Sequence, residues 1–155
     1  MRTPESVGEV MSRDVVTLSE DQDLRHLEEV MRVCRFRHMP VTDEDRLVGI
    51  LSHRDILRIS SSSLLPRQRE QNDLLAGAFR VRDVMVRNPR SVNPETPLTE
   101  AAHLMQREKL GCLPVVDEKN RLVGILTEAD FVRLALELLE GRSEPGPKSG
   151  TAASA

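Results

Sequence analysis

The chain has 155 residues, of which 39% are hydrophobic, so it can bury one sizeable core and one globular domain is the default expectation. Its 25 acidic and 22 basic side chains give a formal net charge of -3 and are mixed along the sequence, which leaves no overall basic field for a nucleic-acid backbone. With three Phe and no Trp or Tyr, the chain also offers no stacking platform for single strands.

Signals for a membrane or for an oxidising compartment are missing from the sequence as well. No apolar run approaches the roughly 20 residues of a membrane-spanning helix, and no apolar segment follows Arg2 as a signal peptide would require. Cys34 and Cys112 form no C-x-x-C pair, which favours reduced thiols that act as small apolar residues. We therefore expect a cytoplasmic protein whose partners include neither a membrane nor a nucleic acid.

The hexapeptide RLVGIL occurs twice, at residues 46–51 and 121–126. The motif V-x-x-V-M at residues 7–11 recurs at 81–85, and one inserted residue in the second polar turn brings the rest of the two copies into register. The chain is therefore a tandem duplication. Its predicted parts are a first repeat at 7–60, a linker at 61–80, a second repeat at 81–140 and a disordered tail at 141–155.

Hydrophobic periodicity predicts the same order of elements, β-α-β-β-α, in both repeats. The first repeat predicts an extended segment at 15–18, a helix at 24–34, strands at 39–42 and 47–51, and a helix at 52–60. The second predicts an extended segment at 91–92, a helix with Thr96 as N-cap and Pro97 as first residue, strands at 113–116 and 122–126, and a helix at 127–139. The linker predicts a short helix around 68–76.

The strands are nearly continuous apolar runs, such as LVGIL, that need cover on both faces of a sheet. One repeat is too small to supply that cover, whereas two copies can bury each other's exposed surfaces. We therefore predict an α/β (α+β) fold in which the two repeats pack through their sheets with pseudo-two-fold symmetry. Gly49 and Gly124, inside the hexapeptides, are expected to allow a close approach of neighbouring backbone.

A hydroxyl residue follows each hexapeptide, with a carboxylate three positions later: Ser52 with Asp55, and Thr127 with Asp130. This is the spacing of a capping box at a helix N-terminus. The same geometry suits a ligand, because a helix N-terminus attracts phosphate and a carboxylate one turn into the helix can accept hydrogen bonds from a ribose diol. The spacing alone leaves both interpretations open.

The residues before the paired strands differ between the repeats. Arg37 and His38 could supply cationic contacts to an anionic ligand, although such a pair is more often a solvated surface feature. Gly111 and Cys112 stand at the matching positions of the second repeat. Two sites built on these positions cannot be chemically equal.

Motifs for catalysis and for metal binding are missing from the sequence. The four histidines show neither an H-x-x-x-H pair nor a Cys/His spacing, so we expect no metal site. The chain has no phosphate-binding loop, no dinucleotide fingerprint and no G-x-S-x-G nucleophile motif. Because no nucleophile and base pair emerges either, we expect no enzyme and no cofactor.

The segment P-V-x-D-x-x-x-L-V-G-I-L is present in the first repeat and, with one more residue in its turn, in the second, and each repeat has the S/T-x-x-D motif. With these motifs the chain resembles a tandem pair of cystathionine-β-synthase-like (CBS) domains, a Bateman module, over residues 7–139. The resemblance implies a non-enzymatic regulatory sensor that binds an adenine-containing ligand, AMP or ATP, in clefts between the repeats. It also implies a homodimer and an effector protein regulated in trans. The alternative is a ligand-independent structural or interaction module in which both motifs only cap helices.

The resemblance further implies roles for individual residues. Asp55 and Asp130 would bind ribose hydroxyls, and Ser52 and Thr127 would lie near phosphate. Arg37 and His38 would contact phosphate in the Asp55 site, and His53 or Arg54 would reach phosphate in the Asp130 site. The adenine would lie against the opposite repeat, beside Val16 and Thr17 or beside Ser91 and Val92.

Overall fold

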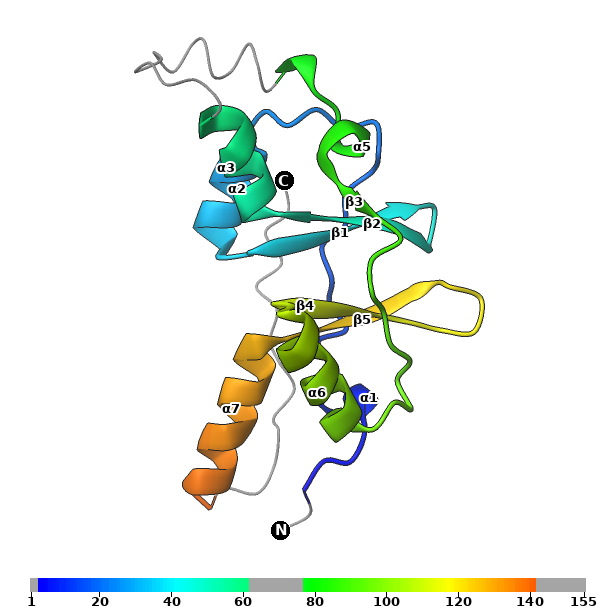
Figure 1. Ribbon diagram of the computed structural model, residues 1–155, viewed down its shortest axis with the longest axis vertical. Helices are drawn as coiled ribbons and strands as arrows, with labels where there is room; N and C mark the ends of the chain where they lie inside the picture. The colour runs from blue at the N-terminus through cyan, green and yellow to red at the C-terminus, as the bar shows by residue number, and fades with distance from the viewer. Residues whose placement is uncertain (1–2, 62–76, 142–155) are drawn as a thin grey trace. The chain divides into compact units, whose positions relative to one another are not determined.

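The computed structural model describes residues 3–61 and 77–141 (Figure 1). The short helix expected around 68–76 lies outside these residues, as does the tail expected to be disordered at 141–155 apart from Gly141. The elements in chain order are α1 (Val7–Val10), α2 (Leu27–Cys34), β1 (His38–Asp43), β2 (Arg46–Ser52), α3 (His53–Ser61), α5 (Val81–Val84), β3 (Val86–Arg87), α6 (Leu98–Glu108), β4 (Cys112–Val116), β5 (Leu122–Thr127) and α7 (Glu128–Leu139). The predicted mixed α/β class is confirmed.

The described residues divide into two compact units that do not follow the repeat boundaries. Unit 1 combines the chain up to Val15 with the chain from Arg90 onward, and unit 2 is Val16–Pro89. The V-x-x-V-M segment that opens the first repeat therefore belongs to the same unit as the sheet of the second repeat. The segment that opens the second repeat belongs, in turn, with the sheet of the first.

Unit 2 is built on a three-stranded antiparallel sheet in the order β1-β2-β3. The β1 and β2 hairpin pairs His38 with Ser52, and its turn contains Glu44 at a positive φ of 53°. On the other edge of β2, Gly49 pairs with Arg87 of β3. Alternate residues of β2 are buried, as expected for a strand with one face on a core. The buried residues are Leu18, Leu24, Leu27, Met31, Met39, Val41, Leu51, Ile56, Val81 and Met85.

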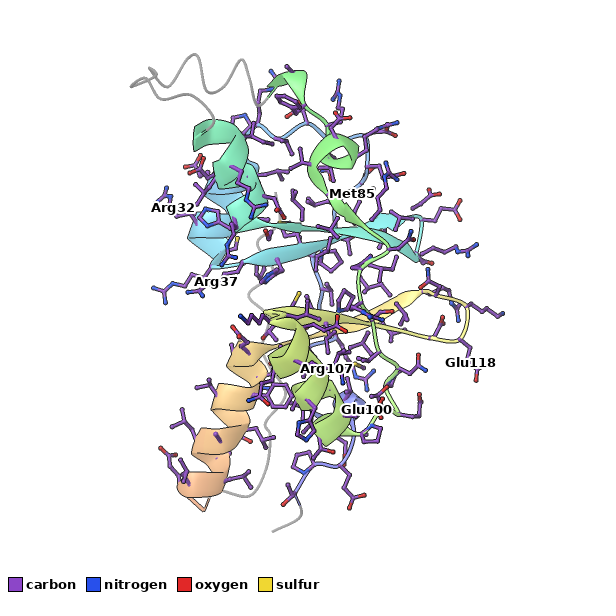
Figure 2. The ribbon with its side chains drawn as sticks, viewed as in Figure 1. Arg32, Arg37, Met85, Glu100, Arg107 and Glu118 are labelled. Carbon is purple, nitrogen blue, oxygen red and sulfur yellow. The ribbon has the colours of Figure 1, made fainter. Side chains whose placement is uncertain are left out.

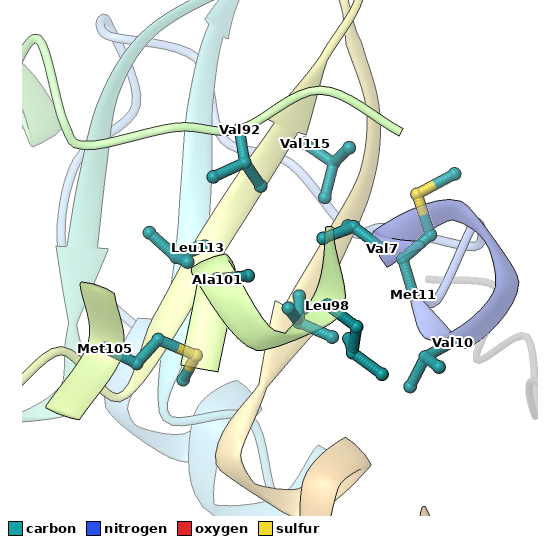
Figure 3. Packing of buried hydrophobic residues seen from close by; sticks show 10 residues of the cluster. Val7, Val10, Met11, Val92, Leu98, Ala101, Met105, Leu113 and Val115 are labelled. Atoms are coloured by element: carbon teal, nitrogen blue, oxygen red, sulfur yellow. The ribbon is translucent and has the colours of Figure 1, made fainter. Parts of the chain in front are cut away.

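Unit 1 repeats this plan with the antiparallel hairpin of β4 and β5, in which Cys112 pairs with Thr127. A bridge between Ser12 and Ile125 extends the free edge of β5, in the place that β3 takes in unit 2. The α1 segment and α6 pack on this hairpin (Figure 3). The buried residues are Val7, Val10, Met11, Val92, Leu98, Ala101, Met105, Leu113, Val115 and Leu126.

Equivalent backbone hydrogen bonds fasten the exchanged opening segment in both units. The N–H of Val7 donates to the Thr96 carbonyl at 3.0 Å in unit 1, and the N–H of Val81 donates to the Gln22 carbonyl at 2.8 Å in unit 2. Unit 2 adds two ion pairs between this segment and the loop before α2, namely Arg82 with Asp21 and Arg87 with Glu20. Exposed ion pairs are weak individually, so we attribute the stability of both junctions chiefly to the buried valines and methionines.

Two local predictions need adjustment. The extended segment expected to open each repeat is a single parallel bridge, between Leu18 and Val41 in unit 2 and between Val92 and Val115 in unit 1. The prediction of Thr96 as the cap of the next helix is wrong, because α6 starts at Leu98 with Pro97 as its N-cap. The hydroxyl of Thr96 instead accepts the N–H of Asn93.

Candidate functional site

The first candidate site is the junction where β2 ends at Ser52 and α3 begins at His53. The Asp55 Oδ2 atom accepts hydrogen bonds from the Ser52 N–H at 3.0 Å and from its hydroxyl at 2.6 Å. The Asp55 N–H donates to the Ser52 hydroxyl at 3.1 Å. The capping box predicted from the sequence is thus formed, and it holds Asp55 in one orientation at the head of the helix.

The second candidate site repeats this junction in unit 1, where β5 ends at Thr127 and α7 follows. The Asp130 Oδ2 atom accepts from the Thr127 N–H at 2.8 Å and from its hydroxyl at 2.9 Å. Each capping box uses the Oδ2 atom of its aspartate. The Oδ1 atom is therefore the one whose surroundings distinguish the two sites.

These surroundings differ in burial and in ion pairing. The Asp55 side chain is 18% exposed, and its Oδ1 atom lies 4.0 Å from Arg58 Nη1, on a side chain that is 74% exposed. The Asp130 side chain is only 2% exposed, and its Oδ1 atom lies 3.2 Å from Arg133 Nη1. Arg133 also approaches Glu137 and donates to the Val10 carbonyl, which ties α7 to the end of α1. The Asp55 carboxylate is the more accessible of the two.

The start of the preceding strand lies against each helix start. In unit 2 the N–H of His53 donates to the carbonyl of Arg37 at 2.9 Å, and His38 pairs with Ser52. The Arg37 side chain is exposed at the edge of the unit, on the same side as Arg32 (Figure 2). The structure therefore brings the predicted cationic pair Arg37 and His38 to the Asp55 junction.

The matching contact in unit 1 joins Glu128 to Gly111, with the Glu128 N–H donating to the Gly111 carbonyl at 3.2 Å. Cys112 is buried beside Thr127, and burial raises the pKa of its thiol to about 12, with the nearby Glu128 carboxylate adding to the shift. This thiol therefore stays protonated and neutral at physiological pH. The backbone contact is the same as in unit 2, but Gly111 and Cys112 stand in place of Arg37 and His38.

The segment predicted to lie beside adenine is also placed within unit 2. Leu18 donates its N–H to the Pro40 carbonyl and accepts from the Thr42 N–H, so the exposed Val16 and Thr17 lead directly to β1. They adjoin the strand of their own repeat, whereas the sequence interpretation placed the adenine against the opposite repeat. His53, half-buried, and Arg54, exposed, lie at the head of α3 in this same unit.

Ser91 and Val92 occupy the corresponding place in unit 1. The N–H of Val92 donates to the Pro114 carbonyl, and the side chain of Val92 is buried in the core, with only Ser91 half-exposed. The repeat register explains this, because Val92 corresponds to the buried Leu18 and Ser91 to the exposed Thr17. The side chain of Val92 is therefore unavailable to a ligand, and its N–H and carbonyl are both hydrogen-bonded to β4.

Sequence reasoning missed Arg58 and Arg133 as members of the two sites. Both stand three residues after the aspartate, a spacing at which opposite charges on a helix meet. That spacing could have indicated the contact but not its difference in length. Within residues 3–61 and 77–141, no three His, Cys, Asp or Glu side chains gather as a metal ion would require. Nor is any helix in this part of the chain long and apolar enough to cross a membrane.

Comparison with known proteins identifies the repeat. The family model of the CBS domain matches the chain twice, over residues 7–62 and 81–137. A CBS domain-containing protein of Dictyostelium discoideum is 32% identical over 135 residues, which cover 86% of this chain and 93% of that protein. Among solved structures, AcuB of Vibrio cholerae is 38% identical and covers 90% of this chain and 98% of its own, with a TM-score of 0.73.

A further solved structure holds a ligand. CBSX2, a CBS-pair protein of Arabidopsis thaliana, was crystallised in complex with AMP, and that structure is 28% identical over 88% of this chain and 99% of its own, with a TM-score of 0.72. Other relatives are far longer, since the chain spans 22% of an inosine-5'-monophosphate dehydrogenase of Methanocaldococcus jannaschii. Because the family model matches both repeats, the chain belongs to the CBS domain family and carries two CBS domains in tandem.

Proposed function

We propose that this protein is a non-enzymatic regulatory sensor that binds an adenine nucleotide, AMP or ATP, through the S/T-x-x-D junctions of its two CBS domains. The observation that carries the proposal is that, within unit 2, β1 begins beside the oriented carboxylate of Asp55 and is bridged by the residue that follows an exposed segment. Arg37 and His38 stand at the start of this strand, and Val16 and Thr17 form the segment. The AMP complex of CBSX2 supports an adenine nucleotide as the ligand.

Each residue has a chemical task in this proposal. Asp55 Oδ2 is engaged in the helix cap, so Oδ1, beyond hydrogen-bond distance from Arg58, is the oxygen that we assign to a ribose hydroxyl. Arg37 and His38, with the positive end of the α3 dipole, attract the phosphate. Val16 and Thr17 lie beside the adenine. Asp130 and Thr127, with Ser91, would form the second site, where the ribose must compete with Arg133 for the carboxylate.

A thermal-shift experiment tests the proposal. A ligand that binds the folded state raises the melting temperature, and AMP or ATP at a hundredfold excess over its dissociation constant would stabilise the protein by about 2.7 kcal/mol. Asp55→Ala should abolish most of this shift. Failure of every adenine nucleotide to raise the melting temperature at millimolar concentration would contradict the proposal.

Asp83 provides a matched control, because it is also a capping carboxylate in unit 2. Its Oδ2 atom accepts the Arg80 N–H at 2.8 Å at the start of α5, away from the α3 junction. Asp83→Ala should lower the melting temperature of the ligand-free protein, as the loss of a cap does, and leave the nucleotide-dependent shift in place. Equal loss of the shift in both variants would contradict a ligand contact of Asp55. No shift in any variant, the wild type included, would favour the hypothesis that the motifs are only helix caps.

That second hypothesis is favoured at one of the two sites by a specific observation. Asp130 is almost fully buried, with Oδ2 in the cap and Oδ1 against Arg133. A site used only for capping would look the same. A single bound nucleotide per chain, lost in Asp55→Ala and retained in Asp130→Ala, would assign capping alone to the second motif.

We also expect a cytoplasmic homodimer that regulates an effector protein in trans. Large apolar side chains exposed on α7 support self-association, since exposed apolar surface marks interaction sites. They are Val132, Leu136, Leu138 and Leu139. Light scattering of the wild type and of Leu136→Glu tests this expectation, and a wild-type chain that is monomeric at all concentrations would contradict it.

A further inference from the structure

We infer that the two sites are tuned for ligands of different charge, the Asp55 site for a nucleoside diphosphate or triphosphate and the Asp130 site for an adenine compound with one phosphate or none. The inference rests on the proposed function and assigns a ligand class to each of its sites. It follows from the side chains that stand at matching positions on the same backbone.

The backbone equivalence comes first. In unit 2 the N–H at the head of the helix, on His53, donates to the carbonyl of Arg37, and in unit 1 the N–H of Glu128 donates to the carbonyl of Gly111. The strand residue that follows pairs in each unit with the hydroxyl residue of the motif. Side chains at matching positions therefore start from corresponding places around the aspartate.

At the Asp55 site these positions are mostly cationic. Arg37, Arg54 and Arg58 occupy these positions around the single carboxylate of Asp55, and the half-buried imidazoles of His38 and His53 are their neighbours in sequence. Arginine binds phosphate through paired N–H donors, and each additional phosphate gives these exposed guanidinium groups another anionic group to bind. This site therefore gains affinity as the phosphate chain lengthens.

At the Asp130 site the same positions are neutral or acidic. Gly111 replaces the first arginine and the exposed Ala129 replaces Arg54, while the exposed carboxylate of Glu128 replaces His53. The matching cation, Arg133, lies against the Asp130 and Glu137 carboxylates. Additional phosphates would meet the charge of Glu128 without a new cation among these matched positions, so this site gains nothing from a longer phosphate chain.

Isothermal titration of the full chain with adenosine, AMP, ADP and ATP tests the inference. We expect wild-type protein to bind ATP more tightly than adenosine, on the order of tenfold for each charge-assisted hydrogen bond that the phosphates add. Arg54→Ala and Arg37→Gly, which copy the second repeat, should each weaken ATP binding about tenfold and leave adenosine binding unchanged. In Asp55→Ala only the Asp130 site should remain, and it should bind ATP no more tightly than adenosine.

The control is Arg46→Ala, which removes the same charge from the opposite end of β2, roughly 20 Å from Ser52 along the strand. It should alter ATP affinity by less than twofold. The reciprocal variant, Glu128→His with Ala129→Arg, should create a second site that prefers ATP. Each of these variants changes an exposed residue, which limits the effect on folding.

The outcomes separate this inference from the proposed function. If no adenine compound binds, both are overturned. If adenosine, AMP and ATP bind with equal affinity, or if Arg46→Ala weakens ATP binding as much as Arg54→Ala does, the inference is overturned while the proposed function stands. An ATP preference that weakens in Arg54→Ala and appears at the second site in Glu128→His with Ala129→Arg supports the inference.

Discussion

The side chain of Met11 lies directly over Gly124. A Cβ atom added to this glycine would stand 2.6 Å from Met11 Sδ and 2.9 Å from the Ser12 carbonyl oxygen. In unit 2, a Cβ added to Gly49 would stand 2.5 Å from Met85 Sδ and 3.1 Å from the Val86 carbonyl. The methionine that ends each repeat's opening motif thus packs against the glycine in the RLVGIL strand of the other repeat.

Gly124→Ala should lower the free energy of unfolding by about 1 to 3 kcal/mol, because the new methyl group meets a backbone carbonyl as well as the methionine. That carbonyl cannot move without disturbing the Ser12 and Ile125 bridge, which has a hydrogen bond of 2.9 Å in each direction. Urea denaturation measures the change. Gly77→Ala is the control, since the three described atoms nearest to its Cβ would all belong to the flexible side chain of Arg25. Equal midpoints for Gly124→Ala and wild type would contradict the predicted contact.

Asp130→Ala should destabilise the ligand-free protein more than Asp55→Ala. Loss of the Asp130 side chain removes a cap and leaves Arg133 without its 3.2 Å partner, for a cost of about 2 to 4 kcal/mol. Loss of the Asp55 side chain removes a cap whose arginine is largely solvated, for about 0.5 to 2 kcal/mol. Urea unfolding of both variants without nucleotide measures the difference. A larger loss for Asp55→Ala would reverse our assignment of the more buried site.

The two cysteines should differ in reactivity. Burial raises the pKa of Cys112 to about 12 from an ordinary value of 9.0, whereas Cys34 is only half-buried. Only the thiolate reacts, so iodoacetamide at about pH 8 should modify Cys34 first in the folded protein and both residues in urea. Mass spectrometry of a time course reads this out. Modification of both cysteines at one rate in the native protein would show that Cys112 is accessible.

The same shift predicts an alkaline loss of stability. A pKa that is raised in the folded state means that the contribution to stability is fully present below pH 9.0 and is lost as the pH rises through the folded value of about 12. The thiolate forms first in the unfolded chain. Cys112→Ala should remove this part of the alkaline decline, and melting curves of both proteins across this pH range test it.

Acid should lower the stability that two surface aspartates, Asp23 and Asp117, contribute through their hydrogen bonds. The pKa of Asp23 is lowered chiefly by a hydrogen bond from the Arg25 side chain, and that of Asp117 chiefly by the Arg121 N–H. Stability from a lowered carboxyl pKa is present above the ordinary value of 3.8 and is lost as the pH falls through the folded value. In Asp117→Asn, the melting temperature should fall less steeply than in wild type as the pH is lowered below about 4. The same decline of the melting temperature in wild type and Asp117→Asn would contradict a stabilising role of the ionised Asp117.

Local features of each repeat were predictable because short-range interactions dominate them. The strands before and after each polar turn follow from apolar runs, and the capping boxes of Ser52 and Thr127 follow from a three-residue spacing that is typical of a helix start. The cap of α6 was mispredicted because Pro97 itself takes the cap position and Thr96 satisfies a loop N–H. Propensity at one residue cannot settle that competition.

The sequence by itself determined the duplication, the α/β class, the order of the two hairpins and of the longer helices, and the positions of the two S/T-x-x-D junctions, since all of these depend on residues close in the chain. The short elements α1, α5 and β3 were not predicted. Only the tertiary structure decided that each opening motif packs on the other repeat's sheet, with Met11 on Gly124 and Met85 on Gly49. The two motifs and the two glycines are alike, so the sequence leaves either pairing open. The near-complete burial of Asp130 and the partial exposure of Asp55 likewise depend on long-range packing, which no local spacing encodes.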